Sequence, residues 1–262
     1  MDLHTVRVLH RPVRRGELDA LLGPGAAALG GGTWLFSEPQ PGLAALVDLT
    51  GLGWPALTRE PDGALTISAT CTLAELAAAG PALFGRCCRA LAGSFKIWHT
   101  ATVGGNICLA LPAGPMTSLC AALDGEALLW GPGGAQRRVP VARFVTGVRT
   151  TDLRPGEVLR SVRLPAAASS ARTAFGRAAL TAQGRSGSVV IGRRDPDGGL
   201  VLTVTAATER PFRFTFPAPP TGAALRAALA GVDRWYADPH GAPDWRAHVT
   251  GRLAAEVVDE LA

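Results

Sequence analysis

The chain has 262 residues, of which 47% are hydrophobic, enough for one large domain or two smaller ones. Its formal net charge is +5, and nearly all of its basic residues are arginines scattered along the chain. Nucleic-acid binding usually gathers such residues into a basic stripe, so we expect no nucleic-acid partner. No run of eighteen apolar residues occurs and the N-terminal segment lacks a signal peptide's apolar core, so we expect a cytoplasmic protein without a membrane span.

Short strands and helices are predicted to alternate in the N-terminal part. The segment 65–70 alternates apolar and polar residues, as a half-buried strand does. Thr72 and Glu75 have the spacing of a capping box that begins a helix. In chain order we expect a strand at 5–10, a helix at 14–22, strands at 26–29, 43–49 and 65–70, and helices at 72–79 and 81–92.

The remaining chain is predicted to contain a hairpin, a linker and a second sheet. A short helix at 116–123 precedes a hairpin, 127–130 and 136–139, around a Gly-Pro-Gly-Gly turn. After a strand at 157–164, the segment 165–171 is the best linker candidate. Beyond it, a small antiparallel sheet backed by helices is expected. Its strands are 173–180, 188–192, 200–206 and 212–216, and its helices are 221–230 and 251–261.

The five cysteines are Cys71, Cys87, Cys88, Cys108 and Cys120. An odd number in a chain without a signal peptide favours free thiols. They form no Cys-x-x-Cys pair and no iron–sulfur ligand spacing, so we expect no metal site in this chain.

Two glycine-rich segments are the most informative motifs. The first is Gly-Gly-Gly-Thr at 30–33, and the second is Ala-Thr-Val-Gly-Gly-Asn at 101–106. Glycines allow positive φ and close approach to a ligand, and successive N–H groups in such turns bind anions. Two loops facing each other would hold a diphosphate, which predicts a dinucleotide cofactor. A plain tight turn at 30–33 and a turn-capping role for Asn106 are the structural alternatives.

Catalytic side chains are not evident in the sequence. Trp34 and Trp98 flank the two segments and would either stack on a cofactor ring or lie in the core. We find no Ser-His-Asp, Cys-His or paired-carboxylate arrangement and name no catalytic residue. The chemistry is therefore expected to belong to a bound cofactor.

The order of the motifs resembles that in the FAD-binding subunits of molybdenum hydroxylases, the family of the xanthine dehydrogenase and carbon monoxide dehydrogenase medium subunits. The resemblance covers most of the chain, and its most specific member is the segment 101–106. The motifs that carry it are Leu-Gly-Gly-Gly-Thr (29–33), Leu-Val-Asp-Leu (46–49), Cys-Thr-Leu-Ala-Glu-Leu (71–76), Ala-Thr-Val-Gly-Gly-Asn-Ile (101–107), Pro-Ala-Gly (112–114), Ala-Leu-Asp-Gly-Glu (122–126), Phe-Val-Thr-Gly-Val-Arg-Thr-Thr (144–151) and Leu-Arg-Pro-Gly-Glu-Val-Leu (153–159).

The resemblance implies an α+β fold. A two-lobed FAD-binding domain (PCMH/vanillyl-alcohol-oxidase-like) would occupy 1–165, with FAD between its lobes. A small C-terminal domain at 172–262, CO-dehydrogenase-flavoprotein-like, would have a three-stranded antiparallel sheet with helices. Both glycine segments would grip FAD through backbone amides. The implied cofactor-binding residues are Gly30, Gly31, Gly32, Thr33, Trp34, Leu35, Thr102, Gly104, Gly105, Asn106, Leu159 and Arg177.

Two positions depart from the family pattern. Pro115 stands where many relatives have an acidic residue that hydrogen-bonds a cofactor hydroxyl. Gly176 stands where a lysine is common, so Arg177 supplies the missing charge or the contact is absent.

The function implied is that of a flavin subunit in a heterotrimeric molybdenum hydroxylase. A large molybdenum-binding subunit and a small 2Fe-2S subunit would carry the other cofactors. Electrons would pass from the 2Fe-2S clusters through FAD to NAD or oxygen. The alternatives are a self-sufficient flavoprotein oxidoreductase, or a scaffold subunit that has lost FAD.

Overall fold

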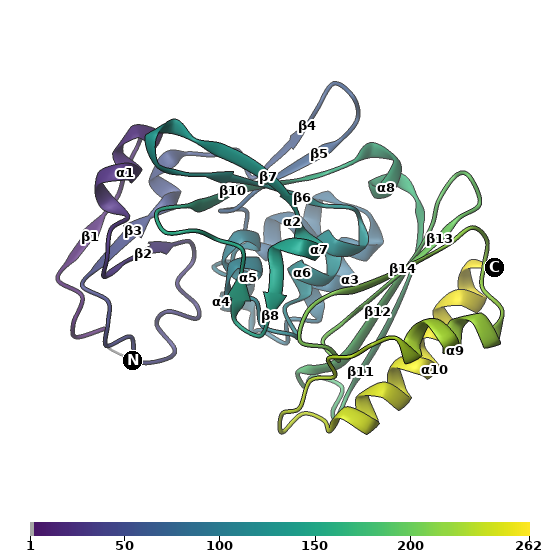
Figure 1. Ribbon diagram of the computed structural model, residues 1–262. Coiled ribbons are helices and arrows are strands. Elements are labelled where there is room, and N and C mark those ends of the chain that lie inside the picture. The colour runs from purple at the N-terminus through teal and green to yellow at the C-terminus, as the bar shows by residue number, and fades with distance from the viewer. Residues whose placement is uncertain (1–2) are drawn as a thin grey trace.

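The computed structural model describes residues 3–262 and contains four sheets with helices between them (Figure 1). A small lobe near the N-terminus holds a parallel three-stranded sheet in the order β1-β3-β2. The predicted helix at 14–22 is a 3₁₀ turn followed by one helical turn. The elements of this lobe are β1 (Val8–His10), η1 (Arg15–Glu17), α1 (Leu18–Leu21), β2 (Ala26–Leu29), β3 (Ala45–Asp48) and η2 (Leu49–Leu52).

The second lobe is built on an antiparallel five-stranded sheet in the order β4-β5-β10-β6-β7. The capping box predicted at Thr72 is confirmed: Thr72 Oγ1 accepts from the Glu75 amide at 3.2 Å, and a Glu75 carboxylate oxygen accepts from the Thr72 amide at 2.8 Å. The hairpin around 131–134 is confirmed too. The strands are β4 (Leu57–Arg59), β5 (Leu65–Ser68), β6 (Glu126–Trp130), β7 (Gln136–Pro140) and β10 (Val158–Leu164).

Helices of the second lobe pack around a buried apolar core beside this sheet. They are α2 (Leu73–Ala79), α3 (Ala82–Arg89), α4 (Phe95–Trp98), α5 (Val103–Leu109), α6 (Pro115–Ala122) and α7 (Val141–Phe144). A 3₁₀ turn, η3 (Pro132–Gly134), joins β6 to β7, and a two-stranded ribbon consists of β8 (Val145–Gly147) and β9 (Thr150–Thr151).

The C-terminal sheet is antiparallel and has the four strands predicted from the sequence, in the order β11-β12-β13-β14, rather than the three that the resemblance implies. The fourth strand forms because β14 pairs with β13 along its whole length. Helix α10 begins at Pro243 rather than at residue 251, since proline is well suited to the first turn. The elements are β11 (Arg172–Ala179), β12 (Ser186–Arg194), β13 (Leu200–Thr205), β14 (Phe212–Phe216), α9 (Gly222–Ala230) and α10 (Pro243–Leu261).

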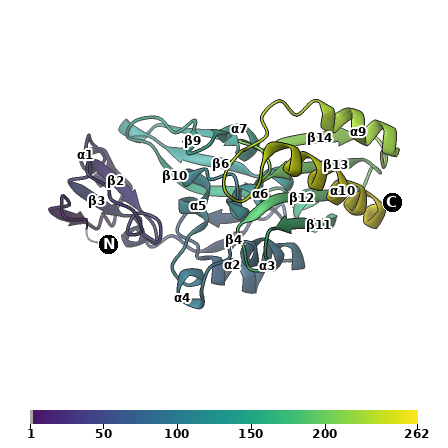
Figure 2. The ribbon, with the colours of Figure 1, turned by 90° about the horizontal axis from the view of Figure 1, so that it is seen from below.

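Helices lie on both sides of the C-terminal sheet, α6 on one side and α10 on the other (Figures 1 and 2). Val189 and Ile191 of β12 belong to the same core as α6, whereas Val190 packs with α10 on the opposite face. The segment 165–171 forms a short helix, α8 (Ala166–Ser170), instead of an irregular linker. The division into domains at 1–165 and 172–262 stays a prediction. In the part of the chain that the structure describes, no helix is long and apolar enough to cross a membrane.

Candidate cofactor site

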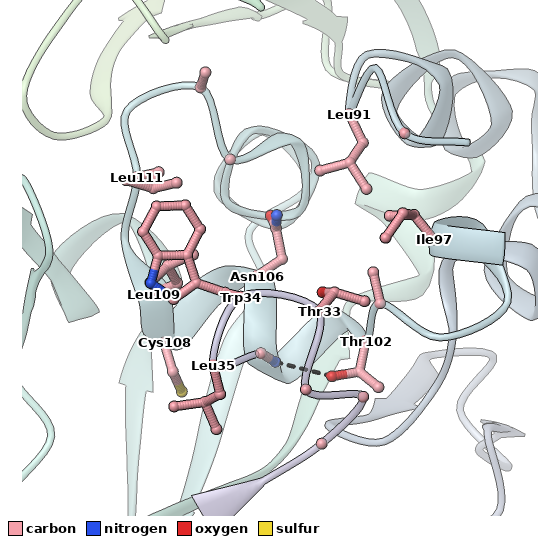
Figure 3. A pocket seen from close by; sticks show the side chains of 18 of the residues that line it. Thr33, Trp34, Leu35, Leu91, Ile97, Thr102, Asn106, Cys108, Leu109 and Leu111 are labelled. Atoms are coloured by element: carbon pink, nitrogen blue, oxygen red, sulfur yellow. Dashed lines mark hydrogen bonds between the residues drawn. The ribbon is translucent and has the colours of Figure 1, made fainter. Parts of the chain in front are cut away.

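A cavity of about 670 Å³ lies beside the first glycine segment, the start of α5 and the turn between β11 and β12. Its size is within the range of about 300–1,000 Å³ that is usual for small-molecule and cofactor sites. Leu91 and Ile97 line one side of it and Trp34 and Leu111 the other, with Asn106 between them (Figure 3).

Close contacts leave no room for a side chain at any of the three glycines of the first segment, and for Gly30 and Gly31 these contacts are with residues 100–102. A Cβ built on Gly31 would lie 1.5 Å from the Thr100 carbonyl oxygen, and one on Gly30 would lie 2.6 Å from Thr102 Oγ1. Gly32 has φ +70° and lies against Phe36. The two segments predicted to face each other are therefore in direct contact.

Backbone amides of the first segment are available to a ligand. Within the described residues 3–262, the amides of residues 31–35 donate to no acceptor, although the turn that follows is closed by a Phe36 amide bond to the Gly32 carbonyl at 2.9 Å. Residues 31–35 all line the cavity. A run of free N–H groups in a turn is an anion-binding concavity.

The second segment differs from its prediction, because it is the first turn of a helix and not a loop. Thr102 is the N-cap of α5, and its Oγ1 accepts from the Gly105 amide at 3.1 Å (dashed in Figure 3). The Val103 and Gly104 amides donate to the Cys71 and Ala69 carbonyls at 2.8 and 2.9 Å. The Val103, Gly104 and Gly105 amides are therefore already used within the protein and are not free to bind a ligand.

Some residues at the start of α5 line the cavity, and others pack against the rest of the protein. Thr102, Gly105 and Asn106 line the cavity. Asn106 Oδ1 accepts from the Met116 amide at 2.9 Å, which leaves its Nδ2 for a ligand. Gly104 lies outside the lining, where a Cβ would be 2.5 Å from the Ala69 Cβ, so its absent side chain allows α5 to pack on the end of β5.

Leu159 and Arg177, the other two predicted site residues, do not line the cavity. Leu159 is buried in the core on β10. The guanidinium of Arg177 donates instead to Ser186 and to two carbonyls of the turn at 180–185. That turn brings Gln183 and Arg185 to the cavity, and neither was predicted from the sequence. Exposed residues in a polar turn give no periodic signal by which to find them.

Of four further residues near the two segments, two line the cavity and two pack in the interior of the protein. Trp34 lines the cavity, with the Arg149 guanidinium carbon 5.6 Å from the centroid of its ring. Trp98 packs against the core. Pro115 is buried at the first position of α6, outside the lining. Burial raises the pKa of the Cys108 thiol at the cavity to about 12, so this thiol is neutral at physiological pH.

All five cysteines are free thiols. Among residues 3–262, no group of three or more histidines, cysteines and carboxylates is placed to hold a metal ion.

Comparison with known proteins identifies a family for this chain. Residues 5–167 match the family described as the FAD binding domain in molybdopterin dehydrogenase. Xanthine dehydrogenase of Oryza sativa subsp. japonica is 37% identical over 70 residues, which are 27% of this chain and 5% of that protein.

Solved structures show the same fold. Carbon monoxide dehydrogenase from Hydrogenophaga pseudoflava matches with a TM-score of 0.83 and 22% identity over 97% of this chain and 96% of that one. Quinoline 2-oxidoreductase from Pseudomonas putida 86 matches with a TM-score of 0.83 and 19% identity over 99% of both chains. The family match covers more than half of the chain and confirms the resemblance seen in the motifs. The chain belongs to the family of FAD-binding domains of molybdopterin dehydrogenases.

Proposed function

We propose that this chain is the flavin subunit of a molybdenum hydroxylase and that FAD lies in the 670 Å³ cavity. The observation that carries the proposal is the row of unpaired amides at residues 31–35 in the wall of that cavity. The diphosphate of FAD would accept hydrogen bonds from these amides. Asn106 Nδ2 would donate to a further oxygen, and the apolar walls would hold the rings.

FAD, when bound, supplies the electron-transfer chemistry. The chain's own residues bind and orient it and exclude water with Leu91, Ile97 and Leu111. No carboxylate or histidine occurs among the residues that line the cavity. A flavin subunit that relays electrons needs no general base there, whereas a self-sufficient oxidoreductase would need an acid or base beside its substrate.

Electron flow through partner subunits is part of the proposal. A large molybdenum-binding subunit and a small 2Fe-2S subunit would deliver electrons to FAD, and NAD or oxygen would accept them. The family of the chain, FAD-binding domains of molybdopterin dehydrogenases, supports this arrangement. A tagged chain isolated from its native host should copurify with both partners. Isolation as a stable monomer would count against the proposal.

The position of the diphosphate can be tested at Thr33, which lines the cavity and is not fully buried. Thr33→Asp puts a negative charge beside the free amides, and the matched variant Thr33→Asn keeps the size without the charge. We expect FAD affinity to fall at least about tenfold in Thr33→Asp and to change little in Thr33→Asn. Equal affinities in the two variants would exclude a diphosphate at this loop.

The same pair separates a flavin subunit from a scaffold that has lost FAD. If FAD is the working cofactor, the complex carrying Thr33→Asp should assemble, hold less flavin than wild type at the same FAD concentration, and lose activity in proportion. A scaffold would keep its activity. Gly104→Val cannot separate a flavin subunit from a scaffold, because a valine side chain at this position would clash with Ala69 and disturb folding.

A further inference from the structure

The turn between β11 and β12 supplies the charge of the cofactor cavity. Gln183 and Arg185 in this turn line the cavity, and Arg185 is the one charged residue among the residues that line it. The rest of the lining is glycine, small and aliphatic side chains, Trp34, hydroxyl and amide groups, and Cys108, whose thiol is neutral. Among the lining residues, the only positive charge that a ligand would meet therefore comes from this turn.

The side chain of Arg177 donates hydrogen bonds to this turn and to the first residue of β12. Its Nε donates to Ser186 Oγ at 2.8 Å, its Nη1 donates to the Ala182 carbonyl at 3.1 Å, and its Nη2 donates to the Gly184 carbonyl. The two carbonyls lie on either side of Gln183, and Gly184 and Ser186 flank Arg185. One planar guanidinium thus fixes the backbone around both residues that reach the cavity.

The strand that carries Arg177 is itself firmly packed. Gly176 faces α10, and a Cβ on Gly176 would lie 3.2 Å from Leu253. Helix α10 therefore packs closely against β11 at this point. Ser186, which accepts from Arg177, is buried at the start of β12. The turn is also closed by a Gly184 amide bond to the Thr181 carbonyl at 3.0 Å. The side chain of Arg185 therefore projects from a supported backbone.

We propose that Arg177 is a positioning residue and that it acts through Arg185. By fixing the turn at 180–185, it places the Arg185 guanidinium to bind an oxygen of FAD that carries negative or partial negative charge. Such an oxygen occurs in the diphosphate and in the ring carbonyls. Charge-assisted hydrogen bonds are strong, and a supported turn lowers the entropy cost of forming them. This inference rests on the proposed position of FAD.

The test measures the affinity of the full chain, freed of flavin, for FAD by fluorescence titration. We expect Arg185→Gln and Arg177→Gln each to weaken binding by about tenfold to a hundredfold. If Arg177 acts through Arg185, the double variant should bind no more weakly than Arg185→Gln alone. Arg172→Gln is the matched control, because Arg172 lies on the same strand and also donates to a backbone carbonyl, that of Glu260, away from the turn.

Riboflavin, which lacks the diphosphate, separates the two kinds of oxygen. Loss of FAD affinity alone in Arg185→Gln would assign the diphosphate, and an equal loss for riboflavin would assign the ring. Wild-type FAD affinity in Arg185→Gln, or additive effects in the double variant, would overturn the inference and leave the proposed function standing. A wild-type chain that takes up no FAD would overturn both.

Discussion

Gly31 lies where the two glycine segments touch, so its requirement for glycine comes from a backbone contact rather than from a positive φ. A Cβ there would be 1.5 Å from the Thr100 carbonyl oxygen, and no rotamer change can relieve an overlap between two backbones. The loop that carries the free amides therefore keeps its shape only with glycine at this position.

Gly31→Ala should lower the free energy of unfolding by at least about 2 kcal/mol and abolish FAD binding, because the loop or the segment at 100–102 must move. Urea denaturation and FAD titration would measure the two effects. Gly42→Ala is the control, since nothing lies within 4 Å of a Cβ at Gly42. Wild-type stability in Gly31→Ala would show that this contact is not as tight as described.

Site residues were predictable where local chemistry defines them. The first segment was recognised because consecutive glycines are expected where a chain approaches a ligand. Gly104 also belongs to a recognised motif, yet its lack of a side chain serves packing on Ala69. Arg185 was not predictable, because its place in the cavity depends on how the C-terminal sheet lies against the segments 28–35 and 90–114, which are distant in the sequence.

At the scale of elements, capping and turn chemistry explain which predictions succeeded. The helix after Thr72 was predicted from its capping box, and the β6–β7 hairpin from its turn glycines. The glycines of 101–106 predict a ligand-binding turn, whereas the structure forms helix α5 there even though two adjacent glycines disfavour a helix. The Thr102 cap and the carbonyls of Ala69 and Cys71 outweigh that preference, and the last two contacts come from distant sequence.

A largely buried ion pair joins Arg137 of β7 to Glu157, the residue before β10, and Arg137 also pairs with Asp152. Arg137 Nε and Nη2 donate to the Glu157 carboxylate at 2.8 and 2.7 Å, and this pairing lowers the pKa of Glu157 below its ordinary 4.5. The Glu157 side chain is 8% exposed. A lowered folded-state pKa contributes stability that is present above the ordinary pKa and lost as pH falls through the folded one.

Glu157→Gln should therefore lower the free energy of unfolding by about 2 kcal/mol at pH 7, and the gap to wild type should narrow as pH falls below 4.5. Denaturant unfolding at several pH values would measure this. Glu126→Gln, which removes an exposed pair with Arg138 in the same hairpin, should cost little at any pH. A gap that stays constant down to the lowest pH would contradict the assigned ion pair.

On the scale of the whole molecule, α6 joins the second lobe to the C-terminal sheet. Ser118 of α6 and Thr205 of β13 share a buried hydrogen bond of 2.6 Å. Arg193 of β12 is 5% exposed and binds Asp124 and Asp195 at 2.6 Å each, and it donates to the Ala122 carbonyl at the end of α6. Because these contacts cross between the two parts, we expect the chain to unfold in a single transition.

Arg193→Ala should remove about 3 kcal/mol of stability, since it leaves Asp195 without its ion-pair partner and leaves Asp124 paired with Arg213 alone. Arg252→Ala, which removes an exposed pair with Glu256, is the control and should cost less than about 1 kcal/mol. Calorimetry would measure both. Two separate transitions in the wild-type chain would show that the parts fold independently.

The central claim is that this chain binds FAD, and the most direct measurement is an absorption spectrum of the purified chain with identification of the cofactor released on denaturation. The account predicts a flavin spectrum and one FAD released per chain. A colourless protein that also fails to take up added FAD would contradict it and would favour a scaffold that has lost the cofactor.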